Sequence, residues 1–221
     1  NIGAGDEVIV PDCTWIATCS PVVQTGAKIV FTDIEKESWC ISVESILKSI
    51  TKKTKAIISV DLYGNMPDYD RLIKICKSKK IILIEDAAES IGSFYKNRPA
   101  GSFGDCSIFS FHGTKMITTG EGGVLLTNNS NLYKRASMLG DHGRYRNKAR
   151  VSNVEIAYKY QMSAMQAALG TVQISRLSGL LKKKRKIFLW YRKYLGNYNF
   201  LTLNTENKFF KSNFWLITMV W

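Results

Sequence analysis

The stretch SIFSFHGTKMITTGEGG, residues 107–123, contains one apolar strand pattern, a loop of small residues and the start of another strand. The strands are predicted over Ser107–Phe111 and Gly123–Thr127. Between them, small residues on both sides of Lys115 let the backbone turn and approach a ligand closely. The stretch therefore predicts two strands of one sheet joined by a lysine-bearing loop.

Upstream of this stretch, short β-branched runs alternate with helical patterns. Strands are predicted at Glu7–Pro11, Lys28–Thr32, Ala56–Val60 and Lys80–Ile84, and helices at Thr18–Thr25, Val43–Ile50 and Tyr69–Lys77. This alternation is typical of α/β proteins with a mostly parallel sheet and helices on both faces. Because ligands of such sheets bind beyond the carboxyl ends of strands, we expect Asp61, Asp86 and the segment after Phe111 along one edge.

Downstream, the pattern is largely helical and then returns to strand-like residues. Helices are predicted at Leu132–Leu139, Ser163–Arg176 and Leu180–Leu195, and a strand at Phe214–Ile217. We predict a large domain over residues 1–189 and the beginning of a smaller α+β domain over residues 190–221. Because the chain opens on Asn1 rather than Met and ends in a strand-like run, we expect a fragment of a longer protein.

The composition argues against several classes of protein. No stretch of the 221 residues approaches the roughly 20 apolar residues that cross a bilayer, and the start does not resemble a signal peptide. The five cysteines are scattered without a C-x-x-C pair, and there are two histidines, which disfavours a disulfide framework or a metal site. We expect reduced thiols and a cytoplasmic protein with no membrane contact.

The net charge of +13 is unevenly distributed. Residues 1–133 have a net charge of −1, whereas residues 134–221 have 17 Lys and Arg against 3 Asp and Glu. The tightest basic run, Lys182–Lys186, falls inside a helical pattern, so the solvated face of a helix is favoured over a nucleic-acid site. A positive field that attracts an anionic substrate such as a nucleotide diphosphate is an alternative.

Lys115 is the first candidate for chemistry. A lysine that forms an imine must lose its proton near neutral pH, which requires a partly dehydrated site and a carbonyl cofactor beside it. Ser110, five residues earlier, has a hydroxyl that can donate to a phosphate. A lone loop lysine is otherwise a solvated surface charge.

Two further segments supply candidates. Asp86, in Glu85–Glu89, follows a buried strand and would need a cation such as a protonated pyridine nitrogen as its partner. The alternative is that Asp86 caps a following helix. Glu89 is expected one helical turn after Asp86, from where it could reach the same ligand. Trp15 follows the first strand and could stack on an aromatic cofactor, with an ordinary core tryptophan as the alternative.

Together these segments resemble the DegT/DnrJ/EryC1/StrS family of sugar aminotransferases, which has the aspartate-aminotransferase type of fold (PLP fold type I). The resemblance runs from Gly5 to Ala168, and the motif FHGTK at residues 111–115 is most similar to the GDP-perosamine synthase branch. It implies that Lys115 bears pyridoxal 5'-phosphate (PLP) and that Asp86 pairs with the pyridine nitrogen. It also implies that Trp15 stacks on the ring and that Ser110 contacts the phosphate.

The sequence departs from the family pattern at several places. Glu89 stands where relatives often have Gln. Lys159 stands where relatives have an Asn that reaches the phosphate of the neighbouring subunit's cofactor, so the resemblance implies a homodimer with shared active sites. Relatives also have an additional N-terminal segment, including a helix N-terminus that binds the phosphate, and a longer C-terminal domain.

The activity implied is transfer of an amino group from an amino acid, glutamate in most relatives, to a nucleotide-linked 4-keto-6-deoxy sugar. A sugar dehydratase of the same fold is an alternative, but such relatives have His at the position of Lys115. A truncated non-catalytic paralogue or a basic nucleic-acid binder would leave Lys115 unused. The sequence does not identify the sugar, its nucleotide, the carbon aminated or the amino donor.

Overall fold

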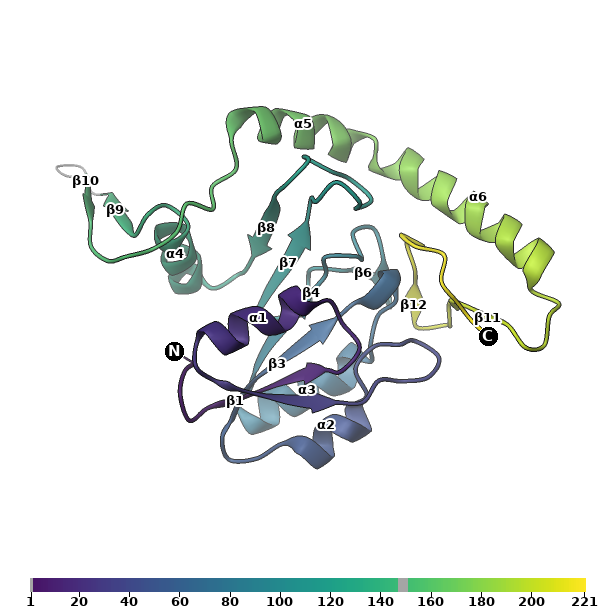
Figure 1. Ribbon diagram of the computed structural model, residues 1–221, viewed down its shortest axis with the longest axis horizontal. Helices are drawn as coiled ribbons and strands as arrows, with labels where there is room; N and C mark the ends of the chain where they lie inside the picture. Colours follow the sequence, from purple (N-terminus) through teal and green to yellow (C-terminus); the bar gives the residue numbers. More distant parts are fainter. Residues whose placement is uncertain (1, 147–150) are drawn as a thin grey trace.

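The computed structural model describes residues 2–146 and 151–221, and its central feature is a six-stranded sheet of order β2-β1-β3-β4-β7-β8 (Figure 1). The strands are β1 (Glu7–Pro11), β2 (Lys28–Thr32), β3 (Thr54–Val60), β4 (Ile82–Asp86), β7 (Cys106–Ser110) and β8 (Gly123–Leu126). All neighbouring pairs are parallel except β7 and β8, which are antiparallel at one edge. The predicted mostly parallel sheet is confirmed.

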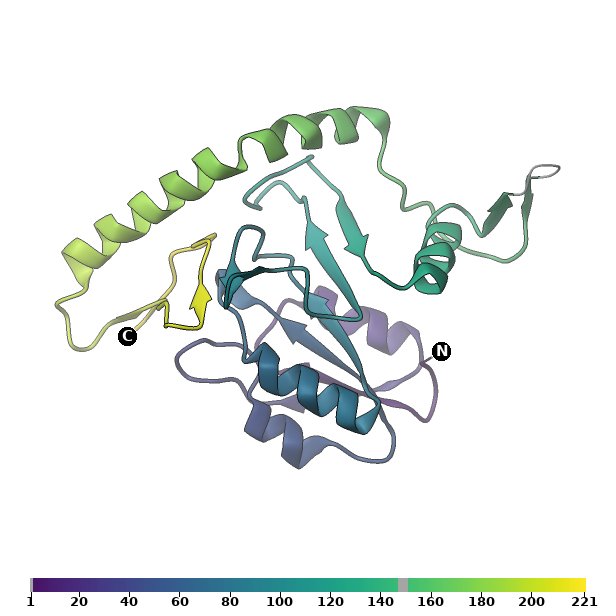
Figure 2. The ribbon, with the colours of Figure 1, turned by 180° about the vertical axis from the view of Figure 1, so that it is seen from behind.

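Helices cover both faces of this sheet. Helix α1 (Ile16–Gln24) lies on the face seen in Figure 1, and α2 (Val43–Ser49) and α3 (Tyr69–Lys79) lie on the face seen in Figure 2. Neighbouring strand residues alternate between the two layers because successive side chains point to opposite faces. Thus Ile9 packs in the cluster that contains Ile46 and Leu72, whereas Val10 packs in the cluster with Val22.

The ends of the helices follow from local chemistry. The Asp68 side chain accepts a hydrogen bond from the backbone N–H of Arg71 and caps α3. At its other end, Lys80 has a left-handed backbone with φ 56°, which stops the helix. The predicted start of the next strand at Lys80 is therefore wrong, and β4 begins at Ile82.

The second half of the chain extends away from the sheet. Helix α4 (Ser130–Leu139) and the hairpin of β9 (Arg144–Arg146) and β10 (Val151–Asn153) lead to α5 (Ala164–Ser175) and α6 (Leu177–Leu195), which form an arch (Figure 1). In the basic run, Lys184 donates to the Trp215 carbonyl and Arg185 pairs with Glu206, so only part of the run is a solvated face. Helix α6 crosses residue 190, and the division at 189/190 stays a prediction.

The C-terminal segment returns to the sheet region. Strand β12 (Phe210–Lys211) joins β5 (Phe94–Tyr95) and β6 (Arg98–Pro99), and β11 (Thr202–Leu203) pairs with β13 (Met219–Val220). The strand predicted at Phe214–Ile217 is wrong, because Phe214 is left-handed with φ 51°. Polar side chains accept the backbone N–H groups of Phe214 and Trp215 in place of a neighbouring strand. Within the described residues, no helix is long and apolar enough to cross a membrane.

Candidate active site

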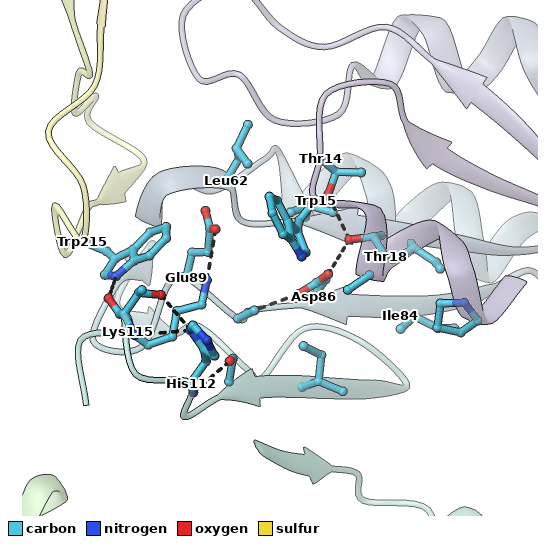
Figure 3. Close-up of a pocket in the computed structure, with 18 residues that line it drawn as sticks. Thr14, Trp15, Thr18, Leu62, Ile84, Asp86, Glu89, His112, Lys115 and Trp215 are labelled. Atoms are coloured by element: carbon cyan, nitrogen blue, oxygen red, sulfur yellow. Dashed lines mark hydrogen bonds and ion pairs between the residues drawn. The ribbon is translucent and has the colours of Figure 1, made fainter. Parts of the chain in front are cut away.

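A cavity of about 680 Å³ opens at the carboxyl ends of β3, β4 and β7 (Figure 3). Val60 of β3 is in register with Asp86 of β4, and the N–H of Asp61 donates to the Asp86 carbonyl at 3.0 Å. The expected edge is confirmed. The polar and aromatic residues that line the cavity are Thr14, Trp15, Thr18, Asp86, Glu89, Ser110, His112, Thr114, Lys115 and Trp215.

Lys115 lies in the loop after β7 with its side chain inside the cavity. Its Nζ lies 3.2 Å from Glu89 Oε1, and the two side chains are 15% and 12% exposed. The opposite carboxylate oxygen of Glu89 accepts the N–H of Tyr63 at 2.8 Å, which fixes the carboxylate. Lys115 is therefore a partly dehydrated amine beside a fixed anion, and the alternative of a solvated surface charge is wrong.

Asp86 ends β4 on another wall of the cavity. Thr18 Oγ1 donates to its Oδ2 at 2.8 Å, and the N–H of Ala88 donates to its Oδ1 at 3.2 Å. Burial raises the pKa of Asp86 above the ordinary 3.8, and these two hydrogen bonds and the charge of Lys115 offset this in part. Residues 87–92 contain turns and no α-helix, so Asp86 is not a helix cap.

Trp15 and Ser110 complete the predicted set around the cavity. Trp15 precedes the first residue of α1 and is 75% exposed, so it is not a core tryptophan. Its indole leaves a flat apolar face available at the cavity. Ser110 ends β7, and its Oγ accepts the N–H of His112 at 3.3 Å. A hydroxyl that accepts this bond keeps its own hydrogen to donate.

The side chains that line the cavity fit PLP. The cofactor is a flat aromatic ring with a pyridine nitrogen, an aldehyde and a phosphate. The lining offers an indole face from Trp15, a buried anion from Asp86 and an amine from Lys115. Figure 3 shows Lys115 and Glu89 on one side of the cavity and Asp86 on the other. Over residues 2–146 and 151–221, no group of His, Cys, Asp and Glu is arranged to hold a metal ion.

Two residues considered from the sequence lie outside the cavity lining. The Lys159 side chain is about half exposed, donates to Gln161 Oε1 at 3.0 Å and lies 3.7 Å from Asp141 Oδ1. Its predicted role at a partner's site stays a prediction. Asp61 is fully buried and accepts hydrogen bonds from Tyr69 and Ser90, and burial raises its pKa well above 3.8.

The structure also brings to the cavity residues that the sequence did not single out, among them Thr18 and Trp215. Thr18 lies one helical turn after Trp15, so the spacing on α1 contains a signal for its presence at the same site. Trp215 comes from the C-terminal segment, and its Nε1–H donates to the Thr114 carbonyl at 2.7 Å across 101 positions of sequence. No local pattern indicates that contact.

The sequence profile of the DegT/DnrJ/EryC1/StrS aminotransferase family matches residues 1–221. The chain is 38% identical to GDP-perosamine synthase of Escherichia coli O157:H7 over 220 residues, which are 100% of this chain and 60% of that protein. It is 39% identical to GDP-perosamine synthase of Vibrio cholerae, again over 100% of this chain and 59% of that protein. The chain thus spans about three-fifths of the length of these relatives.

Solved structures agree with the sequence comparison. Helicobacter pylori PseC, an aminotransferase of pseudoaminic acid biosynthesis, superposes with a TM-score of 0.91 at 28% identity over 98% of this chain and 58% of that one. A Streptococcus pneumoniae protein provisionally assigned as a sugar aminotransferase superposes in its PMP form with a TM-score of 0.92 at 31% identity, over 98% of this chain and 62% of that one. The same protein has been solved in a PLP form.

Proposed function

The chain belongs to the DegT/DnrJ/EryC1/StrS aminotransferase family, and on that premise we propose that the whole protein is a PLP-dependent sugar aminotransferase. It transfers an amino group from an amino acid, with glutamate as the proposed donor, to a nucleotide-linked 4-keto-6-deoxy sugar. The observation that carries the proposal is a partly dehydrated Lys115 amine facing a cavity that also contains the Asp86 carboxylate and an exposed indole.

The residues of the cavity have separate tasks. When bound, PLP supplies an electron sink that lets an amino group leave one substrate and join another. Lys115 would hold the cofactor through its amine, and the same amine would move a proton as general acid and base. Asp86 is the anion that keeps the pyridine nitrogen protonated, with Thr18 fixing its orientation at 2.8 Å.

The remaining cavity residues bind and orient the cofactor. Trp15 would pack its indole against the ring, and the Ser110 hydroxyl would donate to the phosphate. Glu89 contacts the Lys115 amine and the Tyr63 N–H, so it holds the amine in place. It would face the phenolic side of the cofactor.

The functional unit proposed is a cytoplasmic homodimer with shared active sites. Lys159 lies outside the cavity of its own chain and is about half exposed, which supports a contact with a neighbouring subunit's phosphate. All five cysteines are free thiols, which fits a reducing compartment. The substrate class rests on the likeness to two GDP-perosamine synthases.

The test is a substrate panel with the full-length protein, PLP and glutamate. GDP-linked and dTDP-linked keto sugars that differ in the position of the carbonyl are supplied one at a time, and 2-oxoglutarate release and the amino sugar are measured. We expect the highest kcat/KM with a 4-keto-6-deoxy sugar. Turnover with none of the sugars, or product that has lost water and gained no nitrogen, would refute the proposed transfer.

A further inference from the structure

Trp215 reaches the cavity from the far end of the chain. It is almost completely buried, and it belongs to a segment, Ser212–Trp215, that is hydrogen-bonded to residues 89–93 through Asn213. Figure 3 shows its indole on the same side of the cavity as Lys115 and Glu89.

Several contacts fix the backbone of this segment. Asn213 Nδ2 donates to the carbonyls of Glu89 and Ile91 at 2.8 and 3.0 Å, and Asn213 Oδ1 accepts the N–H of Trp215 at 2.8 Å. Lys184 of α6 donates to the Trp215 carbonyl at 2.8 Å. A bulky residue rarely adopts the left-handed conformation of Phe214, and it persists here because the surroundings determine it. The backbone that carries the indole is therefore fixed by hydrogen bonds on several sides.

The indole contacts both the reactive side chain and the backbone before it. Lys115 Nζ lies 4.0 Å from the centroid of the Trp215 ring, within the range of a cation–π interaction. The Trp215 Nε1–H donates to the Thr114 carbonyl at 2.7 Å. With Glu89 Oε1 at 3.2 Å, the ammonium has an anion and an aromatic face as fixed neighbours.

The geometry points to Trp215 as a positioning residue that holds the Lys115 amine in the cavity through its ring face and holds the Lys115 loop through its Nε1–H. This inference rests on the proposed function and deepens it. Capture requires the Lys115 ammonium to lose one proton to solvent. The neutral nitrogen then bonds to the aldehyde carbon of PLP, and the aldehyde oxygen leaves as water with the two remaining amine protons. A lysine side chain has many rotamers, and an amine that starts in the reactive orientation completes this step faster than one that must find it.

The experiment uses full-length protein stripped of cofactor, to which PLP is added. Stopped-flow absorbance gives the rate of capture, and borohydride followed by peptide mapping gives the lysine that carries the pyridoxyl group. Trp215→Met fills much of the same volume without an aromatic face, and Trp215→Phe retains the face without the donor. The matched control is Trp190→Met on α6, where Lys186 Nζ lies 5.3 Å from the ring centroid and Trp190 is 52% exposed.

We expect Trp215→Met to slow capture about tenfold and to spread the label to other lysines, with partial rescue in Trp215→Phe. At saturating PLP, kcat falls by a similar factor and KM for the keto sugar changes little. Thermal unfolding identifies the variants that fold, and the rates at which those variants capture PLP test the positioning role of Trp215.

Two outcomes contradict the inference in distinguishable ways. If folded Trp215→Met and Trp215→Phe label Lys115 as fast and as selectively as the unmodified protein, the inference fails and the proposed function stands. If the Trp215 variants have a higher KM for the keto sugar and an unchanged rate of PLP capture, the inference also fails, and Trp215 contacts the substrate instead. If the unmodified protein itself captures no PLP on Lys115, both the inference and the proposed function fail.

Discussion

Replacement of Asp86 by Asn separates the charge of this residue from its shape. The two side chains are nearly isosteric, and Asn retains an oxygen for the Ala88 N–H at 3.2 Å and a polar group beside the Thr18 hydroxyl at 2.8 Å. We expect the folded structure to be unchanged. The substitution therefore removes the anion and little else.

The expected loss of activity is large because the charge lies in a dehydrated site. Two opposite unit charges about 4 Å apart attract by about 4 kcal/mol at an effective dielectric constant of about 20. Removing one preorganised electrostatic partner from an active site typically raises the barrier by about 2.7–4 kcal/mol. Because about 1.4 kcal/mol corresponds to tenfold, kcat/KM of Asp86→Asn should fall by about 10²- to 10³-fold.

The expected effect on stability has the opposite sign. Burial raises the pKa of Asp86 in the folded, cofactor-free chain above 3.8, so the folded state binds this proton more tightly than the unfolded state. Its stabilising contribution is complete below pH 3.8 and is lost as the pH rises through the folded pKa. At pH 7, cofactor-free Asp86→Asn should therefore have a Tm equal to or above that of the unmodified protein.

Steady-state kinetics with glutamate and the keto sugar give kcat/KM of Asp86→Asn. Calorimetry of the cofactor-free proteins gives the Tm. Asp70→Asn, on the exposed surface of α3, is the matched control and should leave kcat/KM unchanged. A rate of Asp86→Asn within about threefold of normal would refute the role of the anion. A clear fall in Tm at pH 7 would refute the inference that the charge is poorly solvated in the cofactor-free chain.

Two further predictions concern the core and the assembly. Glu85 is fully buried and accepts from three backbone N–H groups and the Ser107 hydroxyl, so Glu85→Ala should lower the free energy of unfolding by at least about 3 kcal/mol in urea titrations. A loss below about 1 kcal/mol would show that water replaces the carboxylate. Mixing inactive full-length Lys115→Ala and Lys159→Glu chains should restore activity in hybrid dimers through one intact site. Verified heterodimers without recovery would mean that Lys159 does not serve the partner's site.

The sheet and the cavity edge could be predicted from the sequence because their signals are local. Buried parallel strands are short apolar runs, and residues that follow them converge on one edge whatever the details of the loops. Asp86 and Lys115 are predicted at one edge in this way, and the structure brings both to the cavity together with Ser110 at the end of β7.

The contacts that the sequence missed are long-range or depend on backbone conformation. Trp215 reaches the Thr114 carbonyl across 101 positions, and no periodicity reports such a contact. The apolar run from Phe214 to Ile217 has the composition of a strand, yet the Ser212 and Asn213 side chains bind the backbone N–H groups that a neighbouring strand would need. The basic run in α6 likewise has Lys184 and Arg185 turned toward the C-terminal segment by acceptors far away in sequence.

The most direct test of the central claim is to identify the lysine that carries the cofactor. Full-length protein loaded with PLP is reduced with borohydride, digested and mapped by mass spectrometry. The account predicts one pyridoxyl group, on the peptide that contains Lys115, and its absence from a folded Lys115→Ala protein. A pyridoxyl group fixed selectively on any other lysine would contradict the assignment of this cavity as the active site.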